Sequence, residues 1–140
     1  MGDRNVYALN QAGRGSEAGS RKVMSVRSAA ILTTDLALNR TVGLVIVPAG
    51  FVVTSHTFVI TDIDTNASPT HAFTIGDAGD TDRLATTATT GQAGGTLTAL
   101  AATGLYYKYP ADTEVFMTST TAAATAAAGT ITYLLEGYME

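Results

Sequence analysis

The stretch TVGLVIVPAGFVVTSHTFVIT (residues 41–61) carries no charged side chain and is interrupted by Pro-Ala-Gly at residues 48–50. Residues 41–47 form a nearly continuous β-branched run, which is typical of a strand covered on both faces. Residues 51–63 continue as a second, longer strand. A membrane-spanning helix needs about 20 uninterrupted apolar residues. The Pro-Ala-Gly break and the polar residues 54–57 therefore favour two β-strands.

Short strands separated by turn signals continue on both sides of this pair. Eight or nine short strands with Gly, Pro and Asp turns predict an all-β fold, a two-sheet antiparallel sandwich of the jelly-roll type. The strands expected are residues 29–34, 41–47, 51–63, 71–75, 83–90, 96–102, 105–109, 114–118 and 130–138.

The Ala-rich residues 121–128 allow two interpretations. Alanine is the best helix former, but eight uncapped residues make a marginal helix. We therefore interpret this segment as a long hairpin connection, with a short helix as the alternative.

Charge divides the chain into two parts. From residue 30 onward, three basic residues face ten carboxylates, a local net charge of −7 (three minus ten). We therefore expect a basic, extended N-terminal arm (residues 1–29) followed by a β-sandwich domain (residues 30–140). Ordering such an arm costs about 1–2 kcal/mol per residue, so it would become fixed against a partner surface. Five of the eight basic residues belong to the arm: Arg4, Arg14, Arg21, Lys22 and Arg27.

The composition is unusual for a solitary soluble domain. Charged residues make up 14% of the chain, against roughly 25% in ordinary domains. Residues 41–61, 84–107 and 115–135 have none at all. Soluble monomers normally distribute charge over their surface, so we expect partners or further copies of the chain to cover part of this one. The absence of Cys excludes disulfides and thiolate metal sites.

Motifs for catalysis are missing from the sequence. The two histidines, His56 and His71, lack the spacing of a zinc site, and we expect both at a surface or an interface. A Ser-His-Asp set could be assembled on paper from Ser55, either histidine and a nearby Asp, but no G-x-S-x-G elbow is present. We therefore expect no enzyme and no cofactor.

Acidic turns are the best candidates for an ion site. Residues 62–66 match the first half of an EF-hand loop, but Ala67 and Phe73 occupy the positions that need Gly and Glu. Asp77, Asp80 and Asp82 could gather around a calcium ion, but turns also select Asp because its side chain caps local backbone groups. No metal is expected, and ion binding by the second loop stays an open alternative.

Two further ligand classes are considered. Tyr106, Tyr107 and Tyr109 could stack on a carbohydrate, but alternation places two of them on one face, which more often indicates packing. Five scattered basic residues without interleaved aromatics argue against direct contact with nucleic acid. Arginine forks suit carboxylates on a protein surface better. A protein partner is therefore favoured.

Four segments occur in a familiar order: VPAGFVV (47–53), FTIGDAGDTDRL (73–84), YKYPADTEVFMT (107–118) and AGTITYLLEGY (128–138). This series resembles the small jelly-roll cement or decoration proteins of tailed-phage capsids, over roughly residues 42–140. The resemblance implies a structural virion protein on the outer surface of the head. It implies binding to the major capsid protein, bracing of neighbouring capsomers and a homodimer, without catalysis, a membrane or direct contact with nucleic acid.

From the residues themselves, we expect the arm to contact the shell through Arg4, Arg14, Arg21, Lys22 and Arg27, and an uncharged strand face to mediate self-association. The alternative is a receptor- or carbohydrate-binding sandwich of a tail fibre or surface appendage.

Overall fold

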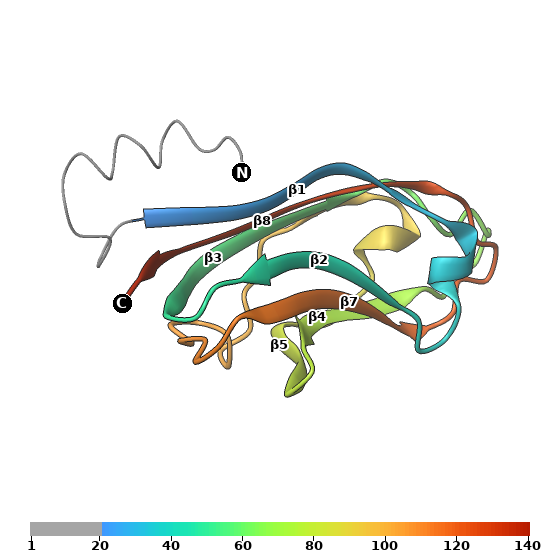
Figure 1. The fold of residues 1–140 in the computed structure, drawn as a ribbon. Coiled ribbons are helices and arrows are strands. Elements are labelled where there is room, and N and C mark those ends of the chain that lie inside the picture. The colour runs from blue at the N-terminus through green and yellow to red at the C-terminus, as the bar shows by residue number, and fades with distance from the viewer. Residues whose placement is uncertain (1–20) are drawn as a thin grey trace.

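The computed structural model describes residues 21–140, which fold into two antiparallel sheets packed face to face (Figure 1). Two short 3₁₀ helices, η1 (Thr33–Leu36) and η2 (Thr90–Gln92), lie in connections. No helix in this part of the chain is long and apolar enough to cross a membrane. The strands are β1 (Arg21–Ile31), β2 (Thr41–Val47), β3 (Phe51–Ile60), β4 (Ala72–Asp77), β5 (Asp80–Ala88), β6 (Gly95–Leu97), β7 (Thr113–Thr121) and β8 (Gly129–Met139).

The strand order identifies a jelly roll. One sheet has the order β1-β8-β3-β6 and the other β2-β7-β4-β5. The hydrogen-bonded pairs β1–β8, β2–β7, β3–β6 and β4–β5 match the two halves of the chain in reverse order, as in a long hairpin rolled into two sheets. The sequence-based prediction of a two-sheet antiparallel jelly roll is confirmed.

The core lies between the sheets, where alternate residues of each strand point inward. Phe51 and Phe58 of β3, Phe73 of β4 and Tyr133 of β8 are completely buried there. β2, however, is an edge strand that pairs with β7 alone, and its Ile46 is 69% exposed. The expectation that residues 41–47 are covered on both faces is therefore wrong, because a β-branched run does not distinguish a central strand from an edge.

The first strand begins earlier than the sequence pattern indicates. β1 starts at Arg21, pairs with β8 and continues to Ile31. The predicted boundary between residues 29 and 30 therefore falls inside a strand, and residues 21–29 belong to a sheet of the sandwich. The predicted strand at residues 29–34 keeps only its first three residues. Residues 1–20 lie outside the described part of the chain.

Two other segments differ from expectation. Residues 105–109 form a loop that runs beside β3, since Val53 exchanges backbone hydrogen bonds with Tyr106 and Tyr107. Residues 122–128 form an irregular connection, as interpreted, but they join strands of different sheets and so do not close a hairpin.

A buried carboxylate closes one end of the sandwich. Asp64, 1% exposed, accepts backbone N–H groups from Thr70 (2.7 Å), His71 (3.0 Å), Ala124 (3.0 Å) and Thr125 (2.9 Å). Burial alone would raise the pKa of this carboxyl, but the four donors stabilise the charged form and lower the pKa far below its usual range. Asp64 thereby joins the start of β4 to the β7–β8 connection.

Candidate functional site

Three of the six basic residues that the structure describes lie on one edge strand. Among the strands of residues 21–140, β1 pairs with β8 alone, so its other side is an edge of the described sheet. Arg21, Lys22 and Arg27, all predicted contact residues, belong to this strand. Arg4 and Arg14, the other two, lie outside the described residues. The structure thus brings three of the five predicted residues together along one exposed edge.

Arg21 is oriented by a carboxylate of the neighbouring strand. Its guanidinium donates to Glu136 Oε2 at 2.9 Å, and Ser55 donates to Glu136 Oε1 at 3.0 Å. Both contacts lower the pKa of Glu136, with Arg21 making the larger contribution. The Arg21 side chain stays 73% exposed. The same three residues, with Thr54, Gly137 and Tyr138, line a shallow hollow of about 440 Å³.

A β-bulge displaces Arg27 from the regular ladder. The register shifts between Val26 and Ala29, and Ser28 has a φ of +50°. The Ser28 N–H donates to the Thr132 hydroxyl at 3.1 Å instead of to a backbone carbonyl. Bulges bend an edge strand and make it a poor template for another strand. Arg27 remains exposed, so this edge presents charge rather than a continuous row of backbone donors.

Beyond Glu136, the outer face of the same sheet carries no charge over β8 and β3. Ser25, Leu134 and Thr57 lie in one cross-strand row, and Thr132 pairs with Val59 in the next. Val59 is 40% exposed. Within residues 21–140, this outer face is apolar or hydroxyl-bearing, and it is bordered by the basic edge. The charge-free stretches of the sequence therefore contribute residues to the outer face of this sheet as well as to the core.

Both histidines are buried in the core, so the expectation that they lie at a surface or an interface is wrong. His56 accepts the Tyr133 hydroxyl at Nδ1 (3.1 Å) and donates from Nε2 to the Ala99 carbonyl (2.7 Å), because a carbonyl can only accept. Burial lowers the pKa of His56 more than the Ala99 contact raises it. His56 therefore stays neutral and joins the core to the loop before β7.

His71 lies near a serine and an aspartate, but the three do not form a catalytic triad. Its Nε2 contacts Ser119 Oγ at 3.0 Å, and that hydroxyl donates to the Asp35 carbonyl at 3.2 Å. Asp64 accepts from the backbone N–H of His71, whereas the ring Nδ1 has no hydrogen-bond partner. His71 and Ser119 are both 0% exposed, so no substrate reaches them. Burial lowers the pKa of His71, although the charge of Asp64 opposes the shift.

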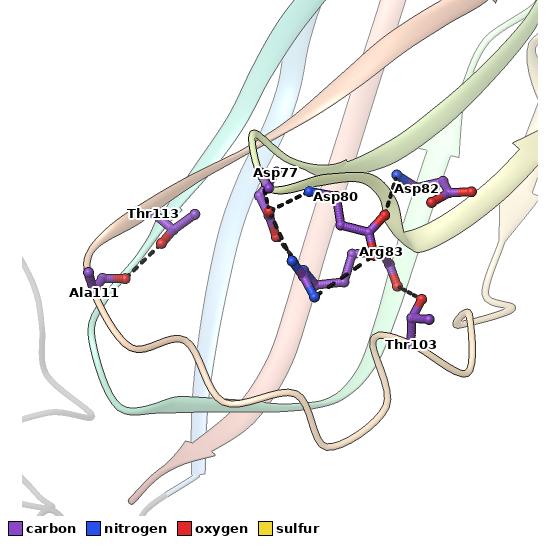
Figure 2. Close-up of polar contacts among 8 residues, drawn as sticks. Asp77, Asp80, Asp82, Arg83, Thr103, Ala111 and Thr113 are labelled. Carbon is purple, nitrogen blue, oxygen red and sulfur yellow. Dashed lines mark hydrogen bonds and ion pairs between the residues drawn. The ribbon is translucent and has the colours of Figure 1, made fainter.

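The acidic β4–β5 hairpin is organised by an arginine (Figure 2). Arg83 donates from Nε to Asp77 Oδ2 at 2.6 Å, and Asp77 also accepts the backbone N–H groups of Gly79 and Asp80. Burial would raise the pKa of Asp77, but these contacts hold it below its usual value. Within residues 21–140, no group of three or more side chains is placed to hold a metal ion. The Asp77 carboxylate thus has Arg83 as its ion-pair partner.

The three candidate tyrosines do not form a stacking platform. Tyr109 is 1% exposed, and its ring meets that of Tyr107 edge-on at 4.9 Å. The Arg83 guanidinium covers the Tyr107 ring at 3.8 Å from the centroid. Only Tyr106, 65% exposed, presents its ring to solvent. The sequence pattern identifies these three tyrosines as candidates. Their alternation does not show that they lie in a loop, where each ring has a different environment.

No protein-family model matches the chain, and no curated protein does. Two solved structures do. The chain is similar over its whole length, and over the whole length of the matched chain, to a chain of the cyanophage Pam1 capsid asymmetric unit, at 29% identity and a TM-score of 0.76. It shares its fold with a chain of the capsid of Ralstonia phage GP4, at 23% identity and a TM-score of 0.69, covering 88% of this chain and 86% of the other. The chain is a phage capsid-related structural protein.

Proposed function

We propose that this chain is a cement protein, which binds the outer surface of the major capsid protein shell and braces neighbouring capsomers. The observation that carries the proposal is the end-to-end likeness to a chain of a phage capsid asymmetric unit. The basic edge of β1 supplies a surface suited to acidic side chains of a shell. The two other predicted contact residues, Arg4 and Arg14, precede this strand in the sequence.

The physical properties of the domain suit this role. A sandwich closed by buried polar contacts is a stiff block, and each copy needs only moderate affinity. Many copies on a fixed lattice act multivalently, because a shell subunit held at two points must break both contacts to move. The brace therefore works without turnover.

We propose the uncharged outer face of β8 and β3 as the surface for a homodimer. Leu134→Lys places a charge at its centre, and Thr120→Lys, on an exposed position of β7, is the matched control. Light scattering should show a dimer for the wild type and the control and a monomer for Leu134→Lys. A monomeric wild type would contradict this arrangement.

The test of shell binding uses phage heads that lack this chain. Added wild-type protein should bind them and raise the temperature and osmotic shock needed to release DNA. Arg27→Glu should weaken binding about 10-fold at low salt, whereas Arg40→Glu, an exposed arginine away from β1, should leave binding unchanged. Binding without any gain in head stability would contradict the bracing role, and equal binding by both variants would contradict the β1 edge as the contact.

A further inference from the structure

A strained, exposed apolar tip lies in the loop between β6 and β7. Tyr106 is 65% exposed, and Leu105 beside it is 47% exposed. Tyr106 has a φ of +61°, a left-handed conformation that bulky side chains rarely adopt. Such outliers persist only where the surroundings impose them, and they concentrate at binding sites. We define Leu105 and Tyr106 as the tyrosine tip.

The base of the tip is rigid. The Tyr106 N–H donates to the Val53 carbonyl at 2.7 Å, and the Val53 N–H donates to the Tyr107 carbonyl at 3.0 Å. On the other side, a Cβ added at Gly104 would come within 2.6 Å of the Arg83 carbonyl, so the loop lies directly on β5. Arg83 in turn covers the Tyr107 ring. Because both flanks are held, the tip projects in one conformation.

We propose that the tyrosine tip is a second attachment point, which inserts into an apolar pocket of the shell protein. This inference rests on the proposed function. A preorganised tyrosine is an effective anchor, since little conformational freedom is lost on binding and its apolar ring ends in a hydroxyl. In the described structure nothing covers the ring.

The surroundings of the tip define the chemistry of the partner. Thr103, three residues before Tyr106, donates to the Arg83 carbonyl at 3.0 Å, which places the acidic hairpin beside the loop (Figure 2). Asp77 is neutralised by Arg83, but Asp80 and Asp82 leave the hairpin acidic, and the pKa of Asp82 is raised by its neighbour Asp80. We therefore expect basic side chains around the apolar pocket of the partner.

The alternatives fit less well. A symmetric contact with a second copy would bring two acidic hairpins together, which electrostatic repulsion opposes. A carbohydrate would need further aromatic and polar groups around Tyr106, but Tyr109 is buried and the Tyr107 ring is covered by Arg83. The charges favour a partner with basic side chains at this point, and the proposed function makes that partner the shell protein.

The position of the tip suits a brace. Val52 of β3 pairs with β8 on one side and bridges to Lys108 on the other. Two strands, β8 and β3, therefore separate the basic edge of β1 from the tip loop, a distance of about 14 Å at the usual strand spacing. A molecule that holds two neighbouring subunits needs contact surfaces on opposite sides, and these two surfaces meet that requirement.

The test uses heads that lack this chain and the full-length protein as Tyr106→Gly. Glycine adopts a positive φ without strain, so this variant should unfold at the same or a higher temperature than the wild type. Its affinity for heads should fall about 30-fold, as expected for loss of a central anchor. Ile46→Ala, which removes an equally exposed apolar side chain from β2, is the control and should bind like the wild type.

Each outcome is decisive. Weaker binding by Tyr106→Gly at undiminished stability supports the tip as an anchor. Wild-type affinity for that variant overturns the tip alone, whereas failure of the wild type to bind heads overturns the proposed function and the tip with it. Loss of self-association without loss of head binding, or binding of the wild type to a glycan that Tyr106→Gly abolishes, assigns the tip to another partner and also overturns the inference.

Discussion

A carboxylate is held in place at each end of β4, but by different groups. Before the first residue of β4, Asp64 is held by four backbone N–H groups from two loops. At the last residue, Asp77 is held by two backbone N–H groups and by the Arg83 side chain. The first end is closed by main chain around a buried charge, and the second by side chains near the surface. Only the second supports an exposed tip.

The two ends therefore differ in role: the Asp64 end only stabilises the fold, whereas the Asp77 end also holds the loop that carries the tyrosine tip. A carboxylate satisfied by backbone donors organises loops without exposing any reactive group. A carboxylate paired with an arginine leaves the other face of the guanidinium available, and Arg83 uses it to fix the Tyr107 ring. We therefore expect changes at the Asp64 end to affect stability alone, and changes at the Asp77 end to affect stability and binding together.

The largest effect is expected at Asp64. Asp64→Asn replaces a charged acceptor of four hydrogen bonds by an amide whose NH₂ faces donors, so the free energy of unfolding should fall by about 3 kcal/mol. Asp62→Asn, an exposed position that keeps its acceptor oxygen, should change it by less than about 0.5 kcal/mol. Urea denaturation measures both. Equal effects of the two variants would show that the four hydrogen bonds to the Asp64 carboxylate contribute no special stability.

A smaller effect is expected at the other end. Asp77→Asn and Arg83→Met should each lower the free energy of unfolding by about 2 kcal/mol, because the pair is mostly buried but reaches solvent. The double variant should show a coupling of about 1–2 kcal/mol. Additive effects would mean that the two side chains act separately. Arg83→Met should also weaken head binding, which Asp64→Asn should not do in its folded form.

Acid should destabilise the core through its histidines. Burial lowers the pKa of both His56 and His71 below 6.5, so the unfolded chain binds more protons than the folded one below that pH. Stability should be constant above pH 6.5 and fall below it, by at most about 1.4 kcal/mol per pH unit for each histidine, until the folded-state pKa is passed. Melting temperatures from pH 8 to pH 5 test this, with His71→Gln expected to reduce the slope. An increase in stability on acidification would contradict the neutral buried state.

The smallest effect on stability is expected at the basic edge. Arg21→Ala removes an exposed ion pair with Glu136, which is worth less than about 0.5 kcal/mol. Head binding should nevertheless weaken, and the difference from the wild type should shrink as salt is raised. A large loss of stability would show that the β1–β8 ladder depends on this pair, and that the edge is structural rather than a contact.

The fold was largely predictable from hydrophobic runs and turn residues. Pro48 and Gly50 end one strand and start the next, and β2 and the start of β3 lie where the pattern places them. The sequence pattern places β1 too late in the chain for two reasons. The bulge at Arg27 and Ser28 interrupts the alternation of the strand, and basic residues stand among its inward-facing residues. The alternating residues 105–109 were mistaken for a strand, because nothing in local alternation reveals the positive φ of Tyr106.

The site was predictable only in part. Clustering of basic residues near the start of the chain predicts Arg21, Lys22 and Arg27 as contact residues, since charge composition is visible without a structure. The structure places all three on β1, and their contact with a partner stays a prediction. The burial of His56 and His71 was not predictable, because their partners Tyr133 and Ser119 are 77 and 48 residues away in sequence. Long-range pairing of this kind is set by the register of the sheets.

The pairing of β1 with β8 has a mechanical consequence. Arg21 lies opposite Tyr138, and the ladder continues to Ile31 opposite Gly129. A pull on the chain at Arg21, directed along the strand axis, loads all of these backbone hydrogen bonds in shear at the same moment. A pull across the strand would break them one after another. If pressure inside a shell strains the molecule through this strand, the domain resists best when β1 lies along the direction of stretch.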